Sequence, residues 1–151
     1  MSDAVKTKKT EDILKDVFKN VKMASDSILN IMPKVEDEKF KSDLTVTLSA
    51  FEAFASRATK LLADEGVKPE EEGTLTKLSA KWGTMMNTMR DSTTSHLAEM
   101  MVEGATMGVN EMLKELRESE NSGVSESALR LTRDVCAFEE KVVEDMKAYL
   151  R

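Results

Sequence analysis

The sequence of 151 residues has one cysteine, two prolines, six glycines and one histidine, and aromatic residues make up only 5% of it. The lone Cys136 excludes an intramolecular disulfide, and so few cysteine and histidine residues exclude a structural zinc site with the usual four ligands. Sheet proteins need turns and aromatic or β-branched runs, which are scarce here. Alanine, leucine, lysine, glutamate and methionine dominate, and all are good helix formers. We therefore expect an all-α protein.

The chain also lacks an excess of positive charge and any long apolar run. The formal net charge is −6 and the isoelectric point is about 5.0. An acidic protein is a poor partner for nucleic acid, because phosphate binding needs a basic surface. No run approaches the ~18 apolar residues of a membrane-spanning helix, and the N-terminus has no apolar signal segment. We expect no nucleic-acid partner, no membrane partner and a cytoplasmic location.

Four long stretches place apolar residues at alternating spacings of three and four, which is typical of helices with one buried face. Pro33 and Gly66 are expected to end the first two helices, and Thr10 is a candidate N-cap for the first. The predicted helices cover residues 11–32, 36–65, 93–117 and 125–150. Their lengths and connections predict an antiparallel four-helix bundle in a single domain, residues 11–151, preceded by a flexible tail, residues 1–10.

The longest connection lies between the second and third of these helices. Residues 67–73 contain Pro69, three glutamates and a glycine, and indicate an exposed linker. We expect a short extra helix over 75–89, followed by a break over residues 91–95, because aspartate, serine and threonine prefer caps to helix interiors. The fold class is thus all-α, with a short helix folded across the bundle.

A methionine-rich stretch from Trp82 to Met112 carries seven of the eleven methionines and the only histidine. On a helix, its spacing forms a second apolar stripe beside the one that faces the core. Methionine is flexible and polarizable, so such a stripe suits either packing inside the monomer or a protein interface. Both interpretations stay open here. The predicted interface, a homodimer contact, consists of Trp82, Met89, Met100, Gly104 and Met107.

Glu99 and Glu103 follow His96 by three and seven positions, so the three side chains can point the same way from one helix. A histidine and glutamates at this spacing can share a metal ion, and histidine with methionine favours copper(I). The alternative is an exposed polar patch beside the methionine stripe. A metal site here is therefore a hypothesis, and no other cofactor is expected.

Three further residues invite chemical hypotheses. Glu139 lies on the apolar face of the last predicted helix, and Glu52 lies beside the core stripe of the second. For each of them two interpretations are open: the carboxyl group is buried, or it reaches water from the edge of the buried face. Cys136 lies at the edge of a buried face, where an inert packed thiol is expected. With one histidine and no nucleophile motif, most acid–base and triad mechanisms lack their residues.

The helix layout resembles the ferritin-like superfamily, and residues 95–109 (SHLAEMMVEGATMGV) resemble a group of small uncharacterised bacterial helical proteins. The resemblance implies a four-helix bundle. Working ferritin-like di-iron sites carry Glu-x-x-His motifs, whereas this sequence has only His96-x-x-Glu99, with Glu52 and Glu139 as possible remnants. We therefore expect a non-catalytic bundle that acts through protein contacts, with a degenerate metal or redox site around His96 as the alternative. An adaptor for a small apolar ligand is a third hypothesis, and the sequence names no ligand.

Overall fold

The computed structural model describes residues 9–68, 84 and 90–150, and the described residues contain helices and no strand. The elements are α1 (Thr10–Ile31), the 3₁₀ helix η1 (Met32–Lys34), α2 (Glu38–Asp64), α4 (Thr94–Ser119) and α5 (Glu126–Lys147). The predicted all-α four-helix bundle is confirmed, and each predicted long helix is present with its ends shifted by a few residues. Thr84 apart, the predicted short helix over 75–89 lies outside the described residues, as does most of the predicted N-terminal tail.

Short polar side chains fix the starts of three helices. Asp37 accepts a hydrogen bond from the backbone of Phe40 at 2.8 Å, and Thr93 and Ser125 accept equivalent bonds three residues ahead. Each bond satisfies a backbone N–H that has no partner within the helix. A break before α4 is present at residues 90–93, which are not helical, and Thr93 caps the helix. Thr94 and Ser95, which were expected to belong to the break, are the first residues of α4.

The first helix begins differently from our expectation. Thr10 was expected to cap it, but Lys9 occupies the cap position and Thr10 is the first helical residue. The Thr10 hydroxyl oxygen instead accepts a hydrogen bond from the backbone N–H of Ser125, at 3.0 Å. The Thr10 side chain therefore makes a tertiary contact with Ser125 and does not cap α1.

Glycine and proline end α1 and α2 as the sequence predicts. Pro33 lies in η1, directly after α1. Gly66 has a φ of 75°, a conformation that glycine adopts without strain. Its N–H donates to the carbonyl of Ala63, and the N–H of Val67 donates to that of Leu62, both at 2.9 Å. This pair of bonds is a Schellman motif, which satisfies carbonyls at the helix end.

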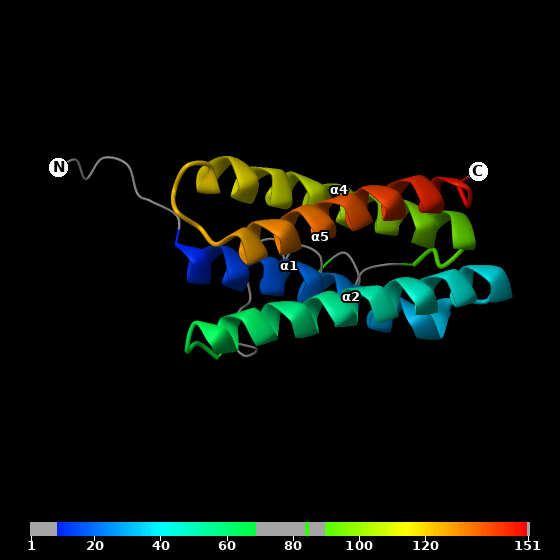
Figure 1. Cartoon of the computed structure of the whole chain (residues 1–151). Helices are drawn as coiled ribbons and strands as arrows, with labels where there is room; N and C mark the ends of the chain where they lie inside the picture. Colours follow the sequence, from blue (N-terminus) through cyan, green and yellow to red (C-terminus); the bar gives the residue numbers. More distant parts are fainter. Residues whose placement is uncertain (1–8, 69–83, 85–89, 151) are drawn as a thin grey trace.

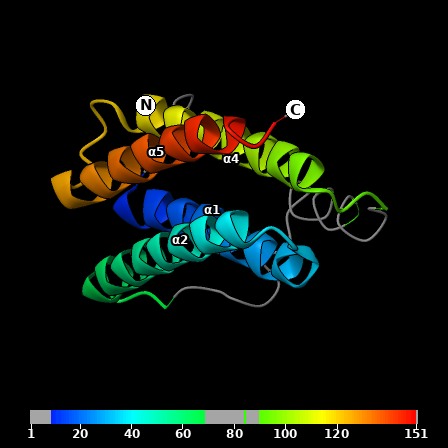
Figure 2. The ribbon, with the colours of Figure 1, turned by 90° about the vertical axis from the view of Figure 1, so that its right-hand side faces the viewer.

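The helices form two antiparallel hairpins, α1 with α2 and α4 with α5, which lie one above the other in both views (Figures 1 and 2). Helices α1 and α5 run in one direction, and α2 and α4 in the other. The end of α2 and the start of α4 therefore lie at opposite ends of the bundle. With 27 residues, α2 is about 40 Å long at 1.5 Å per residue, so residues 65–93 connect points separated by much of that length.

The core lies between the two hairpins and draws on all four helices. Edge-to-face contacts join Phe51 of α2 to Phe138 of α5, with ring centroids 5.1 Å apart, and Phe40 to Tyr149, 4.8 Å apart. Each large apolar side chain that is fully buried contributes about 1.5–3 kcal/mol. The largest of these are Phe40, Phe51, Ile13, Leu14, Ile28, Ile31, Leu44, Leu62, Leu97, Met112, Leu131 and Met146.

Candidate functional site

A carboxylic acid lies at the centre of the bundle. Glu139 projects from α5 and is only 2% exposed, although the neighbouring buried positions of that helix are apolar. Burial penalises the charged form and raises the pKa of Glu139 from its ordinary 4.5 to about 8, and no charged neighbour contributes to this shift. At neutral pH the side chain is therefore mainly a neutral carboxyl group. Of the two interpretations open for Glu139 from the sequence, the buried one is correct.

A glycine on the facing helix makes room for this carboxyl group. Gly108 of α4 is buried, and a Cβ atom placed on it would overlap Glu139 Oε2 and lie 2.6 Å from Glu139 Cδ. No side chain larger than hydrogen fits beside Glu139 unless the carboxyl group moves. The group that approaches Gly108 most closely is thus the carboxyl group of Glu139.

An asparagine from α1 completes the cluster. Asn20 is 8% exposed, and its Nδ2 donates a hydrogen bond to the carbonyl oxygen of Gly108 at 3.3 Å. Within the described part of the chain, neither Asn20 Oδ1 nor Glu139 Oε1 has a hydrogen-bond partner, and both atoms are buried. Buried acceptors without partners are uncommon in native proteins and call for a local explanation.

A small cavity beside these two oxygens supplies that explanation. Its volume is about 30 Å³ as the space open to a water's centre, whereas a buried water needs about 10–15 Å³ of such space. The cavity thus has room for one water molecule, and a water there would be able to donate to both acceptors. The residues that line it are Asn20, Met23, Ala24, Ser27, Phe51, Met101, Gly104, Ala105, Gly108, Glu139 and Val142.

The residues of the metal hypothesis lie along the outer part of α4, away from this cluster. His96 is half-buried, whereas Glu99 and Glu103 are exposed. Among residues 9–68, 84 and 90–150, no group of three or more histidine, cysteine, aspartate or glutamate side chains is placed to hold a metal ion. Asp91 lies close enough for the charge of His96 to help lower the Asp91 pKa, although hydrogen bonds from Thr93 are the larger cause.

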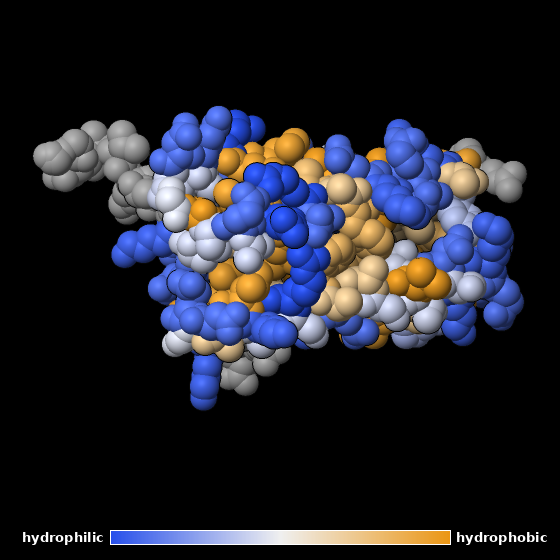
Figure 3. Space-filling view, in the orientation of Figure 1, coloured by the Kyte–Doolittle hydropathy of each residue, from blue (hydrophilic) through white to orange (hydrophobic). Residues whose placement is uncertain are grey.

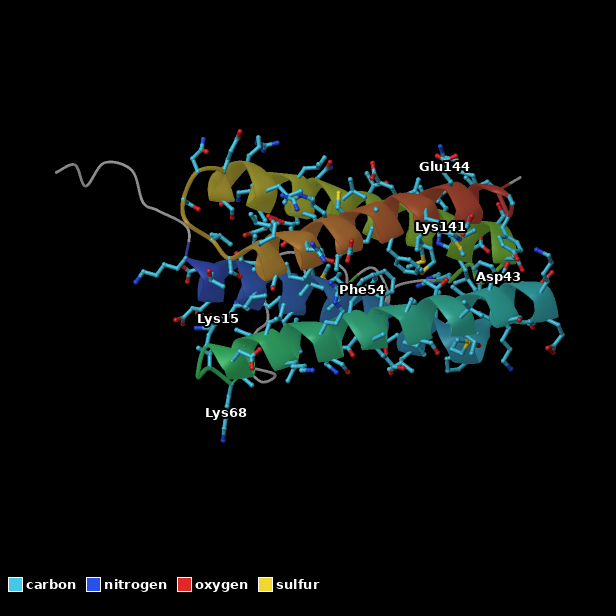
Figure 4. The ribbon with its side chains drawn as sticks, in the orientation of Figure 1. Lys15, Asp43, Phe54, Lys68, Lys141 and Glu144 are labelled. Atoms are coloured by element: carbon cyan, nitrogen blue, oxygen red, sulfur yellow. The ribbon has the colours of Figure 1, made fainter. Side chains whose placement is uncertain are left out.

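The residues of the predicted interface differ in their burial. Met100 is only 3% exposed and belongs to the core, whereas Gly104 and Met107 are half-buried. Trp82 and Met89 lie outside the described residues. A further apolar area is visible on the face formed by α2 and α5 (Figure 3), where Phe54 lies between the two helices (Figure 4). Val46, also on α2, is 69% exposed.

Neither Glu52 nor Cys136 adds a reactive group to the cluster. Glu52 is exposed, so it does not pair with Glu139 inside the bundle. Cys136 is 5% exposed, and burial together with the nearby Glu140 and Glu139 raises the pKa of its thiol. A raised pKa disfavours the nucleophilic thiolate. The expected burial of the thiol is confirmed, and its lack of reactivity stays a prediction.

Asn20 is the member of the cluster that the sequence analysis missed. Asn20 lies three positions after the buried Val17 and four positions before the half-buried Ala24, so it has the helical spacing of a core residue. A polar residue at a core register was therefore present as a signal. A buried amide needs partners, so this position could have been examined for them.

Comparisons with known proteins support the fold. No protein-family model and no curated protein matches the chain. The structure is similar to the solved structure "YcfI, a putative structural protein from Rhodopseudomonas palustris", with a TM-score of 0.73, 13% sequence identity and 97% of each chain covered. At that identity the likeness shows the fold alone: nearly the whole chain adopts a helical-bundle arrangement found in a bacterial protein. In the described part of the chain, no helix is long and apolar enough to span a membrane.

Proposed function

We propose that this protein is a non-catalytic helical bundle that acts through contacts with other protein molecules, beginning with a second copy of itself. The observation that carries the proposal is the content of the bundle centre: one neutral carboxyl group, one amide and a cavity of about 30 Å³. Acid–base catalysis needs positioned partner groups, and drug-sized ligands need pockets of about 300–1,000 Å³. The centre suits a structural role, in keeping with the printed name of YcfI.

The proposed contact includes Gly104 and Met107 on one flank of α4. Trp82 and Met89, the other expected interface residues, lie outside the described residues. Both described residues are half-buried, so part of their apolar surface remains available. Glycine lets a partner backbone come close, and methionine adapts to the shape of the surface it meets. A two-fold dimer would place this flank against its own copy.

Replacing Met107 with glutamate is expected to convert the dimer into a monomer while the helices stay intact. A buried interfacial carboxylate, repeated by symmetry in both copies, loses water and gains no cation. We expect the dissociation constant to rise at least ~10-fold, which corresponds to about 1.4 kcal/mol. Sedimentation velocity over a concentration series measures it, with circular dichroism as the check on folding. Met100 is unsuitable for this test because its burial would make a glutamate disrupt the core.

Two matched variants locate the contact. Leu113→Glu changes an exposed apolar residue (42%) elsewhere on α4 and should leave the dimer intact. Val46→Glu makes the same change at an exposed position of α2. Dissociation by Val46→Glu but not by Met107→Glu would contradict the α4 contact, and a wild-type monomer at about 10 µM would contradict the dimer itself.

A relationship to the ferritin-like superfamily is part of this proposal. Two observations support it: α2 and α4 run in the same direction, so one long crossover joins them (Figure 1), and ferritin-like bundles have one such connection. Glu139 and Asn20 come from two helices near the bundle centre, where ferritin-like proteins carry metal ligands. An uncharged asparagine on α1 replaces the charge that a di-metal site would require.

The alternative function is metal binding by His96 with Glu99 and Glu103, supported by the half-burial of His96 and the proximity of Asp91. Elemental analysis separates it from the main proposal. Protein purified without a histidine tag, incubated with iron, manganese, zinc or copper and then desalted, is expected to retain less than one equivalent. One equivalent of metal in the wild type, lost in His96→Ala, would establish the alternative instead.

A further inference from the structure

Several polar contacts between described residues join the two hairpins. Most of these lie on the outside of the bundle, where water and salt leave an ion pair worth little; Arg57 and Asp134, for example, are each nearly half exposed. The contact between Asn20 and Gly108 is buried, and Glu139 packs directly on it. The contacts are Asn20 with Gly108, Arg57 with Asp134, Tyr149 with Asp43 and Lys39, and Ser125 with Thr10.

The buried contact tolerates a neutral Glu139 and opposes a charged one. The lining of the cavity is mainly apolar, and the described residues that form it include no lysine, arginine or histidine. An ionised carboxylate there would lose its hydration without gaining a counter-charge, which is costly in a protein interior. It would regain water most directly if α1 moved away from α4 and α5.

The described residues that line the cavity beside Glu139 carry no positive charge that would stabilise its ionised form. The cavity residues of α1 are Asn20, Met23, Ala24 and Ser27, that of α2 is Phe51, and those of α4 are Met101, Gly104, Ala105 and Gly108; none of these side chains titrates. On α5, Cys136 and Glu140 are the nearest titratable groups. Both are acidic, so their ionisation adds repulsion.

We propose that Glu139 is the proton-binding group of a joint between the two hairpins: with its proton bound, the joint is closed around Asn20 and Gly108, and when the proton leaves, the hairpins separate while each stays paired internally. The joint responds to alkaline conditions, since the carboxyl group holds its proton into the neutral range. Lys39, near the start of α2, and Tyr149, just after α5, have pKa values raised above their ordinary ranges, so they keep their protons while Glu139 titrates.

Spin-label distances between exposed positions test the joint. The background is Cys136→Ala, which removes the native thiol. One labelled pair, Ser56→Cys with Asn110→Cys, spans the two hairpins; the other, Asn110→Cys with Arg130→Cys, lies within the hairpin of α4 and α5. Double electron–electron resonance is measured at pH 6 and at pH 9, in chains with Glu139 and in chains with Glu139→Gln. The amide has nearly the same shape and does not ionise.

We expect a pH-dependent change only in the distance across the two hairpins, and only in chains that carry Glu139. Between pH 6 and pH 9 the distance across the hairpins lengthens by several ångströms and broadens, while the distance within the hairpin stays constant. In Glu139→Gln, both distances are the same at the two pH values. An unchanged cross-hairpin distance, an equal change in Glu139→Gln, or a joint change in both pairs would each overturn the proposal, the last by indicating general unfolding.

Discussion

Gly108→Ala is expected to destabilise the wild-type protein by up to about 2 kcal/mol and to stabilise a protein that already carries Glu139→Ala. In the wild type the new methyl group overlaps Glu139 Oε2, so the carboxyl group is forced toward the cavity. Overpacking of this kind costs about 1–3 kcal/mol, offset by about 1 kcal/mol of helix propensity gained when alanine replaces glycine. With Glu139 truncated, the strain is absent and the propensity gain remains.

A double-mutant cycle measured by urea unfolding checks this reversal of sign. The wild type, both single mutants and the double mutant give a coupling energy between positions 108 and 139, which we expect to be at least ~1–2 kcal/mol. Additive effects of the two substitutions would contradict the packing of Glu139 on Gly108. The cycle does not depend on the proton, and so it tests geometry independently of charge.

Glu139→Gln is expected to remove a steep loss of stability as the pH rises from about 5 to 8. The raised native pKa means that the folded protein holds a proton which the unfolded chain releases above its ordinary pKa of 4.5. Stability from this group is therefore fully present below pH 4.5, declines by about 1.4 kcal/mol per pH unit above it, and levels off above the folded pKa of about 8. At pH 7 the glutamine variant should be more stable by about 3 kcal/mol.

Free energies of unfolding at several pH values test this prediction. Asp91 gives the opposite trend in acid, because hydrogen bonds from Thr93 lower its pKa. The difference between the wild type and Glu139→Gln removes this shared contribution. Glu140→Gln is the matched control, since it makes the same change at the next residue, which is exposed. Parallel pH profiles for the wild type and Glu139→Gln would contradict a buried, neutral Glu139.

The helices and the core could be predicted because their signals are local and periodic. In the first predicted helix, Leu14, Val17 and Val21 follow the spacing of three and four residues, and all three are at most 1% exposed. Pro33 and Gly66 predicted helix ends correctly. Proline lacks the backbone N–H that continues a helix, and glycine readily adopts the positive φ that ends one, whatever the fold. Such features depend on a residue and its near neighbours in the chain.

The central cluster could not be predicted because it depends on which helices meet. Glu139 has the same local sequence whether it lies at an edge or at the centre, and the position of Gly108 on the facing helix decides between the two. Asn20 contacts a carbonyl 88 positions away in the chain. The Thr10 side chain was assigned to its own helix and bonds instead to the backbone of Ser125.

The central claim is that the middle of this bundle holds a carboxyl group that burial keeps neutral at pH 7, and the proposed structural role rests on it. The direct measurement is the titration of the Glu139 carboxyl carbon by ¹³C NMR, assigned by its absence in Glu139→Gln. The account predicts a midpoint near the pKa of about 8 that burial produces. A midpoint near the ordinary value of 4.5 would contradict it, because the carboxylate would then be charged at neutral pH, through contact with water or a cation.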